Sequence, residues 1–356
     1  DHSPLNKNNK LVFFHEADMA SSSAPKANTH VQIVLSDFES GKELFRTSSN
    51  AYNWQQGSKM MWLDEERFIF NDSRNGKLYS RIINSSDLNK KEEIPFPIYD
   101  CKANFALSLN FDRLTYFRPD YGYRSANSTI DISSFNDEKD GVFYIDFKTK
   151  ERNLIISLKD LKSSSKADFQ GKEHWVNHIM ISPNSKRFMF LHRWIENGAK
   201  KDALYVADID GNNLECLINE GMVSHCFWKN DQEIVGYLRS NKYGNTYHCI
   251  HLSNKEVKKI EITVGERFGD GHPSMFKDQM LFDTYPDRSG MKHLRIFNEK
   301  TLELRGLGAF YEPLKYYEES RCDLHPRYSM DGKIVFFDSV HSGKRRLSYI
   351  NLEEAK

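Results

Sequence analysis

A short apolar motif that recurs seven times constrains the fold of this chain more than any other feature. Its copies occupy residues 10–15, 67–72, 113–118, 187–192, 233–239, 279–283 and 333–338. A polar turn precedes each copy, most clearly at residues 182–186 and 329–333, where Pro, Asn, Asp and Gly supply the dihedral angles of tight hairpins. Repeats spaced by roughly 40 to 50 residues are typical of propeller blades. Each copy is therefore predicted to be the second strand of a blade.

Seven such units in series predict an all-β protein, a seven-bladed β-propeller in which sheets pack face to face. A pair of β-sandwiches is the alternative, but it would not produce seven similar units. Helical periodicity is nearly absent, with residues 158–165 as a single turn of helix or a loop. We expect one propeller domain over residues 1–356, with blades near residues 2–48, 54–95, 104–157, 178–218, 225–263, 272–307 and 325–353.

The two ends of the chain carry an expectation about ring closure. After Asp338 the last unit has one more strand, at residues 346–352, so its outer strand is expected upstream of residue 1 or is dispensable. The chain opens within a repeat, at Asp1, without the pattern of a secretion leader. A periplasmic or secreted location is expected if an upstream leader was removed, and a cytoplasmic one otherwise.

Composition excludes several classes of function. Apolar residues make up 39% of the 356 residues, but no run of about 18 of them could cross a membrane. Fifty Lys and Arg balance fifty Asp and Glu, so the overall charge favours neither nucleic acid nor a membrane surface as a partner. The five cysteines show no paired spacing, which argues against a disulfide framework. We expect a soluble monomer.

Histidines stand where the first, innermost strand of most units should begin. Five of the seven units have one, namely His2, His178, His225, His272 and His325. The other two units have Gln56 or Gly57, and Asn104, near that place. Innermost strands run alongside the propeller axis, so these positions should converge. A purely structural ring of histidines that bond neighbouring carbonyl groups stays open as an alternative.

The C-terminal histidines predict a metal site. His225, His272 and His325 come from adjacent blades, and Cys322 precedes His325 in a Cys-x-x-His motif. Three neutral imidazoles and a thiolate suit zinc, whereas manganese or calcium would require more oxygen ligands. We therefore expect a divalent metal, with zinc first.

Other polar residues should share the face on which the histidines lie. In an antiparallel pair the end of the second strand lies beside the start of the first. That rule places six residues on one face: His15, Asp72, Arg118, His192, Asp283 and Asp338. Long polar insertions at residues 17–30, 120–141 and 158–175 are expected to be loops on a rim, where binding residues are common.

Several of these segments resemble a known family. Residues 175–183, 190–194, 223–228, 269–274, 283–288 and 322–327 are similar to the propeller polysaccharide lyases, the oligogalacturonate lyase and ulvan lyase group. The resemblance covers about residues 175–345. In the first half of the chain only the spacing of the blade repeats is similar. It implies a metal on the axis, held by histidines at blade starts, and β-elimination on uronate-containing chains. His178, His225 and His325 match that pattern, but Cys322 stands where glutamine is expected, so the metal could differ.

The reaction that the resemblance implies requires side chains in three chemical roles. Elimination beside a uronate requires a group that neutralises the carboxylate, a base for the C5 proton and an acid for the leaving oxygen. Arg193 and Arg118 are the candidate neutralising groups, because a guanidinium holds a carboxylate with two hydrogen bonds. His192 and His178 are candidate bases, and Tyr243 is a candidate acid, or both acid and base.

Candidate substrate-binding residues complete the predicted site: His15, Tyr121, Trp194 and Arg288. Aromatic rings can stack on sugars, although most in a propeller pack between blades. Two other functions remain open. A glycoside hydrolase would require facing carboxylates, with Asp283 and Asp338 as the pair, and a non-catalytic propeller would recruit proteins. The first choice is a lyase acting on an acidic poly- or oligosaccharide.

Overall fold

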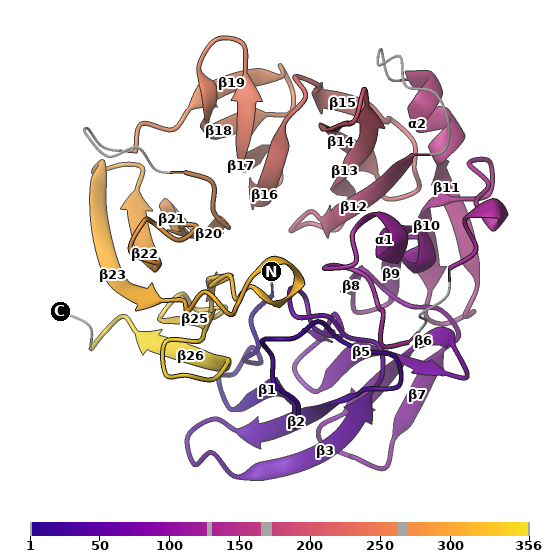
Figure 1. Ribbon diagram of the computed structural model, residues 1–356, viewed down its shortest axis with the longest axis vertical. Coiled ribbons are helices and arrows are strands. Elements are labelled where there is room, and N and C mark those ends of the chain that lie inside the picture. The colour runs from indigo at the N-terminus through magenta and orange to yellow at the C-terminus, as the bar shows by residue number, and fades with distance from the viewer. Residues whose placement is uncertain (1, 127–129, 165–172, 263–268, 355–356) are drawn as a thin grey trace. The chain divides into compact units, whose positions relative to one another are not determined.

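The computed structural model describes residues 2–126, 130–164, 173–262 and 269–354 (Figure 1). Seven antiparallel sheets of three or four strands follow one another along this part of the chain. This is the sheet succession of a seven-bladed β-propeller, so the predicted fold class is confirmed. The chain forms two compact units. An N-terminal unit comprises residues 2–164 and 315–321, and a C-terminal unit contains the described residues of 173–314 and 322–354.

The N-terminal unit contains three sheets. Their strands are β1 (Leu11–Glu16), β2 (Val31–Asp37) and β3 (Glu43–Ser49); β4 (Met61–Trp62), β5 (Arg67–Arg74), β6 (Lys77–Asn84) and β7 (Lys91–Ile94); and β8 (Asp100–Lys102), β9 (Phe105–Ser108), β10 (Gly141–Asp146) and β11 (Arg152–Ser157). In the first sheet, β1 is the predicted second strand, and a single bridge from Leu5 to Val12 stands where a first strand would pair.

The third sheet differs from the prediction. The segment expected as its second strand, residues 113–118, belongs instead to helix α1 (Phe111–Phe117). Asn110 caps this helix, because its side chain accepts hydrogen bonds from the N–H groups of Asp112 and Arg113. The buried Phe111 and Leu114 are three residues apart, which is helical spacing. The true second strand is β9, so the first strand of this sheet begins at Asp100 rather than near Asn104.

The C-terminal unit contains four sheets. Their strands are β12 (His174–Ile181), β13 (Arg187–Glu196), β14 (Ala199–Asp208) and β15 (Glu215–Ile218); β16 (Val223–Asn230), β17 (Glu233–Ser240), β18 (Gly244–His251) and β19 (Glu256–Lys259); β20 (Ser274–Phe276), β21 (Gln279–Asp283), β22 (Met291–Asn298) and β23 (Glu303–Tyr311); and β24 (Arg327–Tyr328), β25 (Ile334–Ser339) and β26 (Arg346–Asn351). The predicted second strands here, β13, β17, β21 and β25, are confirmed.

Apolar side chains between consecutive sheets form the core of the C-terminal unit. Met189 and Leu204 of one sheet pack with Trp228 and Ile234 of the next, in one continuous cluster. Similar clusters join the next pairs of sheets. The first strands also contact one another in series, β12 with β16, β16 with β20 and β20 with β24. Packing therefore brings the starts of these four first strands close together.

The remaining elements agree with the sequence patterns. Helix α2 (Leu158–Ser164) lies where a turn of helix or a loop was expected. Parts of the insertions predicted at residues 120–141 and 158–175 lie outside the described residues. All five cysteines are free thiols. Neither helix has the length and hydropathy that a bilayer-spanning helix requires.

Candidate metal centre

Four histidines lie in a row along the first strands of the C-terminal unit, three of them near the strand starts and His178 within β12. The ring centroids of His225 and His272 are 4.0 Å apart, and those of His272 and His325 are 4.1 Å apart. The ring of His178 lies 5.7 Å from that of His225. His178 sits in a bulge of β12 with a left-handed backbone (φ 51°). A bulge turns a side chain away from the regular alternation of a strand, which places this ring beside its neighbour.

Asp283, at the end of β21, holds two of these histidines. Its Oδ1 accepts the backbone N–H of His272 at 2.6 Å, and Oδ1 and Oδ2 lie 3.0 and 3.1 Å from Nδ1 of the same ring. Oδ2 also accepts the backbone N–H of His325 at 3.2 Å. Asp283 is 1% exposed. One buried carboxylate therefore fixes His272 and the backbone of His325 together.

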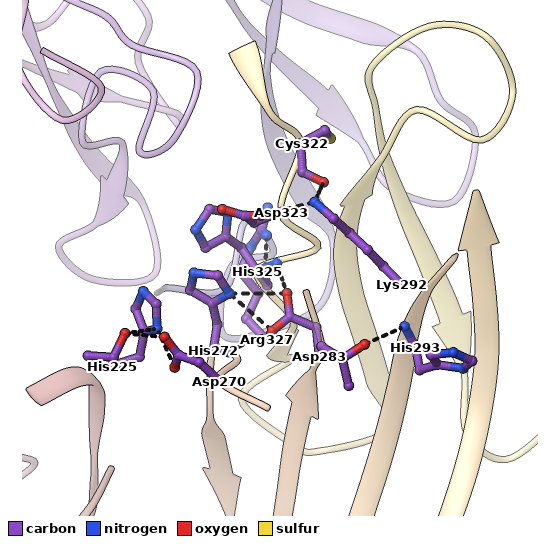
Figure 2. A network of polar contacts seen from close by, with 12 residues as sticks. His225, Asp270, His272, Asp283, Lys292, His293, Cys322, Asp323, His325 and Arg327 are labelled. Atoms are coloured by element: carbon purple, nitrogen blue, oxygen red, sulfur yellow. Dashed lines mark hydrogen bonds and ion pairs between the residues drawn. The ribbon is translucent and has the colours of Figure 1, made fainter. Parts of the chain in front are cut away.

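A second carboxylate orients His225. Oδ1 of Asp270 lies 3.1 Å from Nδ1 of His225, and the hydroxyl of Ser224 donates to Oδ2 of Asp270. Figure 2 shows Asp270 beside His225 and Asp283 beside His272. Histidines that bind metals usually donate their other ring N–H to a carboxylate in this way. Both rings are thus held with Nδ1 engaged and Nε2 available.

One set of possible ligand atoms converges. A ring nitrogen of His272, a carboxylate oxygen of Asp323 and a ring nitrogen of His325 all lie within 4.8 Å of one another. Nε2 of His272 is buried and has no hydrogen-bond partner among the described residues. A buried polar atom without a partner is costly unless something binds it. The donor set and this nitrogen together fit a divalent cation.

The electrostatics keep two of the rings neutral. Burial, reinforced by the neighbouring His272, lowers the pKa of His225 and lowers that of His325 well below its ordinary value. Burial also acts to lower the pKa of His272, but the carboxylate of Asp283 outweighs it and raises that pKa. Because imidazole binds metals in its neutral form, His225 and His325 are in the ligand state at neutral pH.

Cys322 does not join this set. Its side chain points away from the histidines (Figure 2), and burial raises the pKa of its thiol to about 12. Its backbone is fixed instead, since the N–H donates to Glu312 at 2.6 Å and the carbonyl accepts from Lys292 at 3.0 Å. The neighbouring Asp323 supplies the oxygen donor. The ligand atoms that meet are therefore two imidazoles and a carboxylate, without the predicted thiolate.

The predicted catalytic pair on β13 is buried. His192 is 0% exposed, and its Nε2 lies 3.0 Å from Nδ1 of His174. Arg193 is 2% exposed, and its guanidinium pairs with Asp202 at 3.3 Å. Trp194, a predicted sugar platform, is 2% exposed. These side chains pack within the unit, so this conformation offers none of them to a substrate.

Tyr243 and Arg288 lie on hairpins instead. Tyr243 is 36% exposed, between β17 and β18, and its ring centroid is 5.9 Å from that of His248. Arg288 is exposed between β21 and β22. Both hairpins leave their sheets at the end where the first strands begin. These two candidates are accessible at the end of the C-terminal unit that carries the histidines.

The other candidates belong to the N-terminal unit. Arg118 makes a two-point ion pair with Asp120, at 2.8 and 3.0 Å, and its guanidinium lies 4.6 Å from the centre of the buried Tyr121 ring. Nε2 of His15 accepts the Ser58 N–H at 3.1 Å. The charge of Arg118 is therefore already compensated within this unit.

His2 contacts the first strand of the third sheet. Nε2 of His2 lies 3.0 Å from Oδ1 of Asp100, and Asp100 begins the first strand of the third sheet. The sequence pattern predicts Asn104 near the start of this sheet's first strand, because residues 113–118 have the apolar pattern of a second strand although most of them form helix α1. Asp100 could have been found only by assigning β8 and β9 correctly.

Three further residues of the site were missed. Asp270 and Asp323 each stand two residues before a ligand candidate, His272 and His325 respectively. That Asp-x-His spacing was a signal within the quoted segments. Lys292 was invisible from sequence, because it reaches the site from β22. Its Nζ lies 2.5 Å from Glu312 and 3.0 Å from Asp323, and it is 1% exposed.

Gly271 allows Asp283 to approach His272. A Cβ at position 271 would lie 1.9 Å from the backbone oxygen of Asp283 and 3.0 Å from its Oδ1. We expect Gly271→Ala to cost about 1 to 3 kcal/mol, as overpacking does, and to weaken cation binding. Gly269→Ala is the matched control, because its Cβ would meet no atom within 4 Å. Urea unfolding and cation titration of both variants test this, and equal behaviour of the two would contradict it.

Comparisons with known proteins support the fold. No family model and no curated protein match the chain. Its structure is similar to that of an oligogalacturonate lyase in complex with manganese (TM-score 0.66, 14% identity, 98% of this chain and 88% of the other covered). It is also similar to the oligogalacturonate lyase of Vibrio parahaemolyticus (TM-score 0.65, 13% identity, 100% and 90% covered).

Propellers with other activities match as well. The β-propeller domain of the Trilobed protease from Pyrococcus furiosus aligns with a TM-score of 0.51 and 13% identity over 97% of this chain and 92% of that domain. At these identities the likeness shows the fold alone.

Proposed function

We propose that this protein is a polysaccharide lyase that cleaves uronate-containing chains by β-elimination, with a divalent cation bound in its C-terminal unit. The observation that carries the proposal is the meeting of His272, Asp323 and His325 beside a buried ring nitrogen that has no hydrogen-bond partner in the described part of the chain. The fold shared with oligogalacturonate lyases, one of them in complex with manganese, supports the same reaction class.

His272, Asp323 and His325 would hold the cation, with His225 as a neighbouring ligand. Imidazole suits zinc and other transition metals, and carboxylate suits harder cations such as manganese. The predicted preference for zinc rested on three imidazoles and a thiolate, but the sulfur of Cys322 points elsewhere and a carboxylate oxygen of Asp323 takes its place. We therefore put manganese before zinc, with calcium last because imidazole nitrogens are poor ligands for it. Such a cation would supply positive charge beside the uronate carboxylate as that group becomes enolate-like.

This chain would move the protons with accessible side chains. His178 is half-buried beside His225 and is the proposed base for the C5 proton. Tyr243, more than a third exposed on the hairpin after β17, is the proposed acid for the leaving oxygen. The buried His192 and Arg193, which contact His174 and Asp202, would then support this surface from below without touching the substrate. Arg288 is left to bind the substrate.

The test follows the ultraviolet absorbance of the unsaturated uronate that elimination creates. The panel contains polygalacturonate and other uronate polymers, offered to protein stripped with chelator and to protein reloaded with manganese, zinc or calcium. We expect absorbance to rise only with loaded protein. His178→Ala and Tyr243→Phe should each lower turnover by roughly 10² to 10⁴ with little change in substrate binding. Tyr349→Phe, exposed on the outer strand β26, is the control and should stay active.

Two results would overturn the proposal. New reducing ends without any absorbance change would show hydrolysis, as in a glycoside hydrolase on the same fold. Polymer binding without cleavage by any loaded form would indicate a non-catalytic interaction module.

A further inference from the structure

Four hairpins of the C-terminal unit project from the end where the histidines lie. They join β13 to β14, β17 to β18, β21 to β22, and β25 to β26. In the second of these sheets, Val223 at the start of β16 pairs with Leu238, near the end of β17. In the last, Arg327 at the start of β24 pairs with Phe336 of β25, which ends at Ser339. Each hairpin tip therefore stands just beyond the start of the first strand in its sheet.

Three of these tips carry an excess of positive charge. We call Lys242, Arg288, Lys344 and Arg346 the basic rim. All four are exposed, and none forms an ion pair within the described part of the chain. Residues 239–246 and 339–346 contain no acidic residue at all. The hairpin between β21 and β22 carries one acid, Asp287. Its carboxylate accepts the Ser289 hydroxyl and contacts the His293 ring.

The opposite end of the same sheets carries charges of both signs. The turns from first to second strands and from third to fourth strands expose acids such as Asp210, Glu256 and Asp331 together with lysines such as Lys255, Lys277 and Lys300. The formal net charge of the whole chain is zero. The four cations of the basic rim therefore stand at the end of the C-terminal unit where the histidines lie.

We infer that the basic rim binds an acidic polymer over several sugar residues, so that the chain acts on long polyuronates rather than on single sugars. This inference rests on the proposed function for the identity of the polymer. A polyuronate carries one carboxylate on each uronate unit, and exposed cations spread over three hairpins match charges spread along a chain. The ammonium of Lys242 lies over the Tyr243 ring, 4.7 Å from its centre, so this hairpin presents a cation and an aromatic ring together.

The electric field of the basic rim attracts an acidic polymer before the two molecules touch. Clustered surface charges of one sign raise the local concentration of an oppositely charged ligand, and salt screens the effect. Binding of a long polyuronate should therefore weaken as salt rises, and binding of a single galacturonate should depend on salt much less.

The experiment measures binding of fluorescent polygalacturonate to chelator-treated protein, at low and at physiological salt. The rim variant is Lys242→Glu, Arg288→Glu, Arg346→Glu. Its control is Lys255→Glu, Lys277→Glu, Lys300→Glu, which changes the net charge equally at the opposite end. We expect the rim variant to lose about tenfold or more in affinity at low salt and most of its salt dependence. The control should change less than about twofold.

Single reversals at Lys242 and Arg346 keep the test decisive if the triple variant does not fold, since each should lose part of the affinity. Unchanged affinity in the rim variants would overturn the inference. Equally tight binding of single-stranded DNA of the same charge would also overturn it, because the rim would then not be assigned to polyuronates. The binding assay needs no turnover. Wild-type protein that binds the polymer through the rim but never cleaves it would contradict the proposed function alone.

Discussion

Asp283→Ala is expected to destabilise the C-terminal unit by about 3 to 5 kcal/mol and to lower its cation affinity by roughly 10- to 100-fold. The carboxylate is buried and accepts from the His272 backbone, the His272 ring and the His325 backbone. Its removal leaves two buried N–H groups without an acceptor and frees the His272 ring to rotate. Loss of stability and loss of binding should therefore appear together.

Urea unfolding and titration with manganese measure the two effects separately. Asp283→Asn should lie between wild type and Asp283→Ala, because the amide keeps one accepting oxygen. Asp338→Asn is the control. This carboxylate is half-buried and pairs with Arg327 at 2.9 Å, so its loss should cost no more than about 1 kcal/mol and spare the cation. If Asp283→Ala bound manganese as tightly as wild type, the assigned role of this carboxylate would be wrong.

Lys292→Met is expected to cost about 3 to 5 kcal/mol, because it strands two buried carboxylates without their counterion. Lys292 is 1% exposed, Asp323 is 1% exposed and Glu312 is 7% exposed. The ammonium group also donates to the Cys322 carbonyl. Cys322 and Asp323, which lead into His325, are thus both hydrogen-bonded to one lysine.

Partial rescue distinguishes charge from packing. Adding Glu312→Gln to Lys292→Met removes one stranded charge and should recover part of the lost stability. Lys333→Met is the control, since Lys333 forms an exposed pair with Glu353 at 2.9 Å and its loss should cost no more than about 1 kcal/mol. The urea midpoint of each variant is the measurement. No recovery in the double variant would mean that the lysine stem, rather than its charge, stabilises this region.

The strands were predictable because their local pattern and their environment agree. The segment from Arg187 to His192 is buried on both faces, as a central strand between packed sheets requires, and its continuous apolar run shows this directly. The segment from Arg113 to Arg118 is equally short and apolar, and a run of this length fits a strand or a helix. The helix was decided by the Asn110 cap and by the buried ion pairs of Arg113 with Asp137 and Asp140, which are remote in sequence.

The site was predictable in its histidines and not in its carboxylates. The spacing of the repeat predicts the positions of His178, His225, His272 and His325, because each histidine precedes the second strand of its sheet by a similar number of residues. Which acid bonds which ring depends on the turn before the strand, as at Gly271, where the absence of a side chain admits Asp283. The Cys-x-x-His spacing suggested a thiol ligand, but the local backbone directs the side chain of Cys322 away and leaves Asp323 beside the histidines.

Asp283 belongs to the sheet of His272, yet it also accepts the backbone N–H of His325, which leads into the next sheet. The junction between these two sheets and the proposed cation centre therefore depend on the same carboxylate. Any ligand that binds this centre in the folded state alone stabilises that state by RT ln(1 + L/Kd), where L is the free ligand concentration. Slower hydrogen exchange would then be concentrated in β20, β21, β24 and β25, so a cation bound at the proposed site would also stabilise the attachment of the sheet β24–β26 to its neighbour.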